Sequence, residues 1–425
     1  MGLGISYQLS KYGHQSVIFE ADDRLGGMAA SFNFGGLKIE RYYHFHCLSD
    51  KPFFKLLREL NLEKKIKWGK TKMGFFYENN LYKWGSPISI LKFKKISIIS
   101  RLRYLLHALR CISIKKWNHL DKVNATFWLK KWLGQEAFNI LWSKLFEYKF
   151  YKFKDDISAA WIWSRIRRLG LSRKNFKETL GFLDGGSYKW ISELEKKLLY
   201  FGVKINLCTA IKNISLEDNA IKLTSSNNIS SKFDVVISTI PLPIVGQILD
   251  EKSFTLKLKK HYLDQISIPC VCIILKTKKK ITDNFWTNIN DERFSIPGII
   301  EFSNLTNKEP YITYVPFYMP KDLKDYSDSD EIFISKSIEC LKAVNKHFEE
   351  KDIIDVHCSR YEFAQPISKV NHFQNLPPMN PVKNLWTIDT SIYYPEDRGI
   401  SESIDYGRKL VKKILKSFEK DEIKK

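Results

Sequence analysis

The sequence predicts an α/β chain, α+β overall, in which one discontinuous domain carries a second domain inserted into it. Three observations lead to this fold class. Helix and strand patterns alternate at both ends of the 425-residue chain, a mainly helical block lies between them, and the length suits two or three domains. Hydrophobic residues make up 44% and charged residues 27% of the chain, which excludes a disordered, collagenous or coiled-coil protein.

The first segment reads as a helix followed by a strand. Residues 2–12 are small and amphipathic, and after a glycine turn residues 15–20 (QSVIFE) form a short apolar strand that ends in an acid. A loop, ADDRLGG, follows, and the pair Gly35-Gly36 indicates a hairpin. From 51 to 180 the pattern is mainly helical, beginning with a helix that Asp50 can cap.

Strands return at about residue 181. LDGGSYKWISELEKKLLYFGVKINL reads as turn, helix, glycine stop and strand, and residues 233–240 (FDVVISTI) form a buried strand that a proline ends. Strands and turns then alternate to about 380, with one helix near 330–349, and the last 45 residues read as strand, loop and helix. We therefore expect residues 1–50, 181–260 and 381–425 to form one domain, and residues 51–180 and 261–380 to form the second, with a helical insertion.

The strongest local motif is a strand, an acid, a loop and a double glycine: Glu20, Arg24, Gly26 and Gly27. In a dinucleotide-binding βαβ unit, the acid that ends the second strand accepts hydrogen bonds from the adenosine ribose hydroxyls. A double glycine lets the backbone pass close to a phosphate or a flavin, where a side chain would collide. An arginine in the loop would offset the charge of a pyrophosphate. A plain hairpin with a turn is the alternative interpretation.

The opening MGLGISYQLSKYGHQSVIFEADDRLGGMAASF resembles the start of FAD-dependent oxidoreductases of the protoporphyrinogen oxidase, phytoene desaturase and flavin amine oxidase superfamily. Two later stretches are similar to the same family. One is LDGGSYKWISELEKKLLYFGVKINL with the IKNI that follows, and the other is LWTIDTSIYYPEDRGISESIDYGRKLV near the end. The resemblance implies a Rossmann-like FAD-binding domain built from discontinuous segments, with an inserted mixed helical and β substrate domain.

The resemblance also implies cofactor-binding positions. Glu20 matches the ribose ligand, and Arg24, Gly26 and Gly27 match the loop over the pyrophosphate and flavin. Ile211 matches the residue whose backbone meets adenine, Thr239 ends a neighbouring strand, and Asp389 matches the acid at the ribityl chain or pyrophosphate. Arg398, Gly399 and Ile400 lie where the last helix begins, and a helix N-terminus there would stabilise negative charge on the reduced flavin.

The chain departs from the family pattern at its start. The family begins with a strand followed by Gly-x-Gly-x-x-Gly, whereas this sequence opens at what resembles the third glycine, Gly2, with Gly4 at the next small position of the helix. The absent strand is central in the parallel sheet, and its loss would expose backbone groups on both neighbours. We therefore expect Met1 to be an internal methionine of a longer product, or the chain as given to retain flavin poorly.

Other candidate sites are weaker. His44 and His46 share a strand face near Cys47, which leaves open a zinc site, a position at the flavin edge, or a hydrogen-bonded pair in the core. We expect no metal, because no second ligand cluster follows. Cys270 and Cys272 are expected to pack in a β core. No side chain stands out as a catalytic base, so the catalytic residues stay unknown.

The net charge of +22 admits an anionic partner, although a Lys-rich drift in composition is the favoured explanation. We expect no nucleic-acid binding because Lys far outnumbers Arg. Residues 88–120 are basic, and Leu102, Leu105, Leu106 and Leu109 follow helical spacing. This helix either packs on the core with a solvated basic side or attaches to an anionic membrane surface. The scattered, odd number of Cys indicates reduced thiols, so we expect a cytoplasmic protein, peripheral at most on the inner membrane face.

These observations favour an enzyme that transfers a hydride between flavin and a small-molecule substrate of apolar or extended shape. Two alternatives stay open. The chain could resemble UDP-galactopyranose mutase, in which flavin acts on a nucleotide sugar without net redox change. It could also be a degenerate, non-catalytic flavin-fold protein. The sequence does not identify the substrate, the electron acceptor or the oligomeric state.

Overall fold

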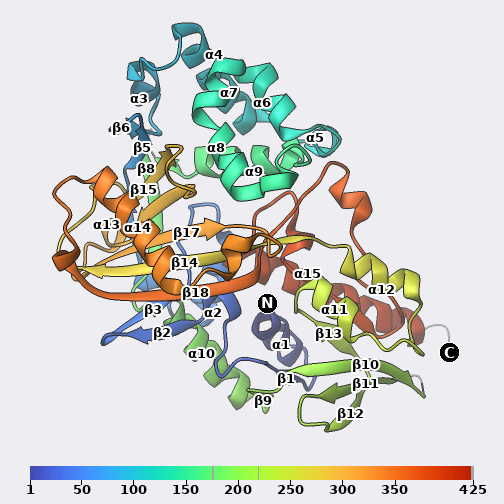
Figure 1. The fold of residues 1–425 in the computed structure, drawn as a ribbon. Helices are drawn as coiled ribbons and strands as arrows, with labels where there is room; N and C mark the ends of the chain where they lie inside the picture. The colour runs from blue at the N-terminus through green and yellow to red at the C-terminus, as the bar shows by residue number, and fades with distance from the viewer. Residues whose placement is uncertain (175–176, 219, 423–425) are drawn as a thin grey trace.

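The computed structural model describes residues 1–174, 177–218 and 220–422. In Figure 1 a helical block occupies the top, a large sheet crosses the middle, and the first helix with the short parallel strands lies below the sheet. The N-terminal helix therefore sits beneath the sheet, while the helical block lies on the opposite side.

The parallel strands below the sheet form two separate pairs. β1 (Val17–Phe19) pairs with β9 (Lys204–Asn206), and β13 (Val236–Ser238) pairs with β19 (Leu385–Thr387). No ladder among the described residues joins the two pairs. Each pair is thus a two-stranded sheet of its own among the described residues.

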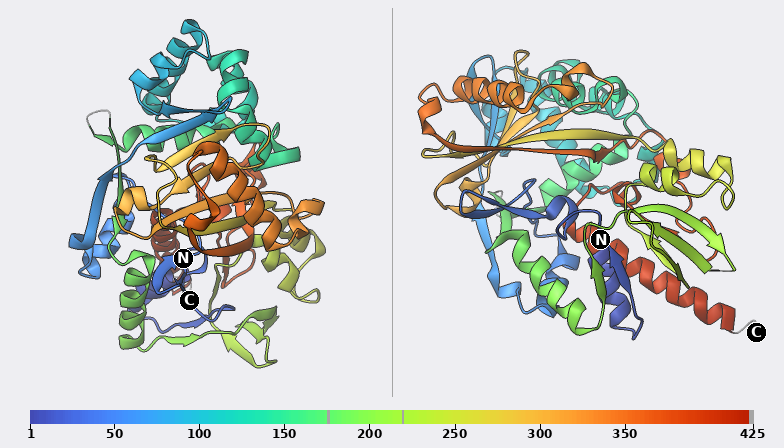
Figure 2. Two further views of the ribbon diagram at one scale, coloured as in Figure 1. Left: turned by 60° about the vertical axis from the view of Figure 1, so that its left-hand side comes forward. Right: turned by 60° about the horizontal axis from the view of Figure 1, so that its bottom comes forward.

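Helices cover these pairs. α1 (Gly2–Ser10) packs against α10 (Gly186–Tyr200) and α15 (Ile400–Glu422), and Figure 2 shows α15 running beside α1. A Cβ on Gly407 would come within 3.0 Å of Ile5, so α15 approaches α1 closely only because this residue is glycine. Ile5, Val411 and Ile414 share one buried hydrophobic cluster.

Smaller β elements surround the pairs. The predicted hairpin is present, with Gly35 and Gly36 at φ of 53° and 83°. Their backbone takes the left-handed conformation that such a turn needs. The strands of the hairpin and of two three-stranded sheets are β2 (Ser31–Phe34) and β3 (Leu37–Glu40); β10 (Ile211–Glu217), β11 (Ala220–Ser225) and β12 (Ser230–Phe233); and β4 (Ile66–Lys70), β8 (Lys177–Leu183) and β7 (Arg173–Lys174).

The large sheet has seven strands in the order β18-β14-β17-β16-β15-β5-β6. Strand β14, next to the edge strand β18, is buried from Ile268 to Thr277, including Cys270 and Cys272, as expected. α14 (Asp330–Val344) packs on one face. The strands are β5 (Met73–Tyr77), β6 (Asn80–Trp84), β14 (Ser267–Thr277), β15 (Trp286–Asn290), β16 (Gly298–Glu301), β17 (Tyr311–Tyr318) and β18 (Ile353–Pro366).

The helical block lies between β6 and β7 in sequence, and its inner side joins the large core over the sheet. Its helices are α3 (Pro87–Lys92), α4 (Ile98–Ser113), α5 (Asn118–Asp121), α6 (Ala125–Leu133), α7 (Gln135–Leu141), α8 (Ser143–Phe150) and α9 (Ala159–Leu171). The remaining helices are α2 (Lys51–Glu59), α11 (Leu242–Ile248), α12 (Leu256–Leu263) and α13 (Ser303–Thr306).

The core-packing interpretation of α4 is wrong for three of its four leucines. Leu102, Leu106 and Leu109 are 49%, 66% and 65% exposed. The side of α4 that faces inward carries His107 and Cys111 instead, because His107 packs edge-on to the Trp128 ring of α6. Within the described residues, no helix has both the length and the hydrophobicity that crossing a membrane requires.

Candidate cofactor and substrate site

The start of α1 lies between the carboxyl ends of β1 and β13. A Cβ on Gly2 would lie 3.3 Å from Oγ1 of Thr239, the residue after β13. Burial lowers the pKa of the Met1 amino group, and the nearby charge of Glu20, which follows β1, opposes that shift. The predicted positions Gly2, Thr239 and Glu20 therefore meet around one helix N-terminus, the arrangement that favours an anionic ligand.

Glu20 is held by its backbone and keeps part of its carboxylate free. Its amide donates to the Asn206 carbonyl at 2.9 Å, and its own carbonyl accepts from the Thr209 amide at 2.8 Å. Oε1 accepts from the Asp22 amide at 3.0 Å, while Oε2 has no partner among the described residues. Because Thr209 lies two residues before Ile211, the predicted ribose and adenine positions are neighbours.

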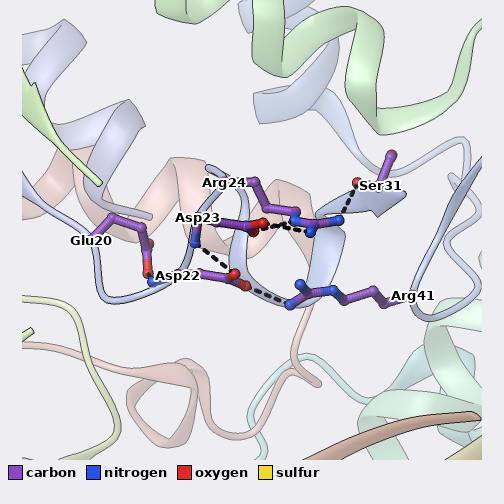
Figure 3. A network of polar contacts seen from close by, with 6 residues as sticks. All are labelled: Glu20, Asp22, Asp23, Arg24, Ser31 and Arg41. Carbon is purple, nitrogen blue, oxygen red and sulfur yellow. Dashed lines mark hydrogen bonds and ion pairs between the residues drawn. The ribbon is translucent and has the colours of Figure 1, made fainter. Parts of the chain in front are cut away.

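Two arginines, Arg24 in the loop after Glu20 and Arg41 directly after β3, each pair with a carboxylate of this loop (Figure 3). Arg24 donates to both carboxylate oxygens of Asp23, at 2.6 and 2.8 Å, and Arg41 donates to Asp22 at 2.6 Å. The hydrogen bond from Arg24 lowers the pKa of Asp23 to about 2. Arg24 is therefore engaged by its neighbour in this structure, and the sequence interpretation missed Arg41.

Glycines leave open space along this loop and along α1. A Cβ on Gly26, at φ 118°, would lie 2.7 Å from Ile191, so the loop packs tightly on α10. Gly27 and Gly4, in contrast, have no heavy atom within 4 Å of such a Cβ. The Ser238 hydroxyl at the end of β13 is buried without a hydrogen-bond partner. Open backbone beside an unsatisfied hydroxyl and a free carboxylate oxygen fits FAD.

Asp389 approaches the same place from the C-terminal segment. Asp389 is 8% exposed, and its carboxylate accepts from the backbone amides of Leu242 at 3.0 Å and Ser391 at 2.8 Å. Burial raises the pKa of Tyr361 to about 12, and the charges of Asp389 and Glu20 contribute further. Tyr361 of β18 is therefore close to both predicted cofactor acids.

The last predicted group lies where α15 begins. Arg398 points toward the large sheet, donating from Nη1 to Gln365 at 2.6 Å and from Nη2 to the Tyr318 hydroxyl at 2.8 Å. A Cβ on Gly399 would overlap Oε2 of Glu402, a buried oxygen without a hydrogen-bond partner. Burial raises the pKa of Glu402 to about 7. Ile400 is the first residue of α15.

The two histidines that follow the first hairpin do not pair with each other. Nδ1 of His44 lies 2.6 Å from the carboxylate of Glu40, which also accepts from the Ser187 amide. His46 stacks on Phe53, and burial followed by the charges of His44 and Arg168 lowers its pKa to about 3. No cluster that could hold a metal ion occurs among residues 1–174, 177–218 and 220–422.

Sequence reasoning missed a set of residues above the start of α15. Lys149, Arg165 and Asp397 lie close to Arg398, and burial followed by the charges of Arg165 and Arg398 lowers the pKa of Lys149. Arg165 lies over the Trp161 ring one helical turn away, at 3.8 Å. That i, i+4 spacing of tryptophan and arginine was the one sequence signal that could have indicated this cluster.

Comparisons with known proteins identify the family and the fold. The family model described as flavin containing amine oxidoreductase matches residues 2–377. A protein described as a protoporphyrinogen oxidase from Exiguobacterium sp. 255-15 has a similar fold, with a TM-score of 0.75, 16% identity, and coverage of 97% of this chain and 96% of that chain.

Two amine-oxidising enzymes have similar folds. Putrescine oxidase, solved with putrescine bound, gives a TM-score of 0.71 at 14% identity over 97% of this chain and 96% of that chain. Cyclohexylamine oxidase from Brevibacterium oxydans IH-35A gives 0.71 at 13% identity over 98% and 97%. No curated protein matches the chain. Because the family model spans most of its length, the chain belongs to the flavin containing amine oxidoreductases.

Proposed function

We propose that this FAD-dependent oxidoreductase transfers a hydride between flavin and an apolar or extended small molecule. One observation carries the proposal: segments far apart in sequence bring Glu20, Asp389 and the start of α1 together beneath the large sheet. The large hydrophobic cluster above them is rich in aromatic side chains, which suits an apolar substrate.

We infer the following cofactor contacts. Glu20 would bind the ribose hydroxyls, and the Ile211 backbone would meet the adenine. Gly2, Gly4 and Thr239 would border the diphosphate at the N-terminus of α1, with Arg24, Gly26 and Gly27 over it, and Arg24 would exchange Asp23 for phosphate. Asp389 would contact the ribityl chain, and Arg398, Gly399 and Ile400 the pyrimidine side of the ring.

Bound FAD supplies a hydride acceptor and donor, and the protein provides binding, orientation and electrostatics. The N-terminus of α15 and the Arg398 guanidinium would stabilise negative charge developing at the ring. The buried core would exclude water from the reacting atoms. No described side chain is assigned as a catalytic base.

The first experiment measures flavin content. The purified chain should show the visible absorbance of bound oxidised flavin after incubation with FAD, and Glu20→Ala should weaken FAD binding by about tenfold, the loss expected for one hydrogen bond to a charged group. Glu63→Ala, which removes a carboxylate paired with Arg58 at the surface, is the matched control. A folded, colourless protein under saturating FAD would favour the degenerate, non-catalytic alternative.

A mutase-like reaction on a nucleotide sugar is the second candidate. The specific observation in its favour is the group of cations beside Arg398, which would suit a diphosphate. Turnover of a nucleotide sugar by the reduced enzyme, without consumption of an electron acceptor, would establish it. Substrate-dependent flavin reduction under anaerobic conditions would instead establish hydride transfer.

We also propose that the α3–α4 end docks on an anionic membrane surface at the inner face of the membrane. Besides the three leucines of α4, Ile88, Ile98 and Ile99 are 66%, 53% and 66% exposed. The neighbouring Lys92 and Lys94 are exposed and have no partner among the described residues. An apolar helix face flanked by basic residues matches an interfacial helix, with about 1 kcal/mol from each basic residue near the lipid.

Flotation with vesicles tests this docking. The protein should float with vesicles that contain anionic lipid and not with neutral ones, and Leu106→Ser combined with Leu109→Ser should abolish flotation. Leu256→Ser on α12, where the leucine is 73% exposed, is the control and should leave flotation unchanged. Equal flotation of the double variant and the wild type would contradict the proposal.

The division into two domains stays a prediction. Its support is that the seven-stranded sheet draws strands only from residues 73–84 and 267–366, inside the two segments assigned to the substrate domain. The parallel pairs draw theirs from the other three segments.

A further inference from the structure

Three cationic side chains meet in the interior above the start of α15, with one carboxylate among them. Lys149 comes from α8, Arg165 from α9, and Arg398 from the turn before α15. The carboxylate is Asp397, whose Oδ2 lies 2.6 Å from Nη2 of Arg165. We call these four residues the inner cation cluster. The two guanidinium groups and the one carboxylate leave a net charge of +1, to which Lys149 adds a further positive charge when it is protonated.

Two donors of the inner cation cluster have no acceptor. Lys149 is 8% exposed, and its Nζ donates no hydrogen bond to a described residue. It lies 4.8 Å from the centre of the Tyr318 ring and 5.5 Å from that of Trp161. Nε of Arg165 is buried and is also without an acceptor. Buried polar groups are nearly always hydrogen-bonded, and an unpaired buried charge lowers stability.

Arg398 uses only neutral acceptors. Its two hydrogen bonds go to the Gln365 amide oxygen and the Tyr318 hydroxyl. Trp161, Gln365, Asp397 and Arg398, together with Glu396, help to line a hollow of about 10 Å³, which is room for a single water. Lys149 and Arg165 lie outside this lining. A larger group would enter only if Arg398 left these neutral acceptors, and a negatively charged acceptor would favour that exchange.

We propose that the inner cation cluster binds an oxyanion of the substrate, either a carboxylate or a phosphate group. The proposal rests on the proposed function and specifies its substrate class. An oxyanion supplies the acceptors that Lys149 and Arg165 lack and offsets the surplus positive charge. A substrate amine in its ammonium form would instead add a fourth cation. The substrate of this chain is therefore anionic, in contrast to the amines named for putrescine oxidase and cyclohexylamine oxidase.

Four probes that share one aromatic ring test this class: benzoate, phenyl phosphate, benzylamine and benzyl alcohol. Calorimetry on the FAD-loaded protein at neutral pH should show at least one anion binding about tenfold or more tightly than benzylamine, the factor expected for one charge-assisted hydrogen bond. Tighter binding of benzoate than of phenyl phosphate would identify the cluster as a carboxylate site, and the opposite order would identify it as a phosphate site. Equal binding of all four probes, or tighter binding of benzylamine, would overturn the proposal.

Lys149→Met is the decisive variant, because it keeps the length of the side chain and removes the charge. It should weaken the preferred anion about tenfold, leave benzylamine unchanged, and leave Tm unchanged or raise it, since an unpaired buried ammonium is lost. Lys152→Met is the matched control, because Lys152 lies just after α8, 57% exposed and paired with Asp322. A lower Tm with unaltered anion binding would show that Lys149 is structural and would contradict the proposal.

The two proposals fail in different ways. If Lys149→Met does not fold, the ranking of the four probes on the wild-type protein still decides the inference. The visible absorbance of the same samples reports flavin content separately. If the protein is colourless but prefers the anions, the oxyanion site is supported and the oxidoreductase function is contradicted. If the protein is yellow but shows no preference for the anions, the oxidoreductase function is supported and the oxyanion site is contradicted.

Discussion

The two β regions of the protein differ in how completely their strands are paired. β14 of the seven-stranded sheet bonds to β17 on one edge and β18 on the other, and its residues from Ile268 onward are buried. β1 bonds only to β9, and Val17 is 37% exposed. The large sheet thus satisfies its own backbone groups, whereas the parallel pairs depend on α1, α10 and α15 and on what binds between them.

The largest effect that separates the two regions should come from truncating a core strand. Ile273→Ala in β14 leaves a cavity at a fully buried position, so the free energy of unfolding should fall by about 2–5 kcal/mol. Val17→Ala in β1 should cost under about 1 kcal/mol, because that side chain already contacts water. Urea denaturation measures the free energy of unfolding of both variants. Equal losses in the two variants would contradict the difference between the two β regions.

Asp389→Ala should be the most damaging substitution on the flavin side. It removes the acceptor for the buried amides of Leu242 and Ser391, which should cost about 2–4 kcal/mol. FAD affinity should fall as well. Asp389→Asn keeps an acceptor oxygen and should restore most of the stability. A variant that loses stability yet binds FAD normally, by absorbance titration, would remove Asp389 from the cofactor site.

Glu402, near the start of α15, should make the stability of the protein depend on pH. Burial raises the pKa of this carboxyl from 4.5 to about 7, so the folded state binds its proton more tightly than the unfolded state. The free energy of unfolding should therefore fall as pH rises from about 4.5 to about 7, by up to about 3 kcal/mol, and then stay level.

Glu402→Gln should flatten that pH profile and be the more stable protein above neutral pH. Glu301 provides a reference in the large sheet, where burial raises its pKa to about 8 although it accepts from the Ile281 and Thr282 amides. Chemical denaturation at several pH values measures the free energy of unfolding of the wild type and of Glu402→Gln. A Glu402→Gln profile as steep as the wild type between these pH values would contradict the assignment.

The sequence alone predicts the features that depend on residues close together in the chain. The strand that ends before Glu20 and the turn at Gly26 and Gly27 follow from contiguous residues, because β1 ends at Phe19 and both glycines take a positive φ. The long helix α15 was likewise readable from apolar spacing. These residues need no information about distant parts of the chain.

Tertiary contacts decide what the sequence did not show. Arg41 pairs with Asp22, 19 residues earlier, and α4 turns its leucines outward, and both outcomes depend on neighbours in space. Lys149 and Arg398 are 249 residues apart, so no local pattern announces that they meet. Sequence spacing therefore indicates a motif whose residues are contiguous, and it misses a cluster whose residues come from separate helices and strands.

The smallest expected effect concerns Gly4. A substitution there should change the stability of the fold and the affinity for FAD in opposite directions. A Cβ there meets no heavy atom within 4 Å, and Gly4 lies inside α1. Alanine should therefore raise the stability of the flavin-free protein by up to about 1 kcal/mol through helix propensity. If the diphosphate passes this turn of α1, the same methyl group should weaken FAD binding, so stability and FAD affinity should move in opposite directions. Thermal unfolding without FAD and an absorbance titration with it measure the two quantities. Unchanged FAD affinity in Gly4→Ala would place the cofactor away from α1, because the methyl group has no other neighbour to disturb.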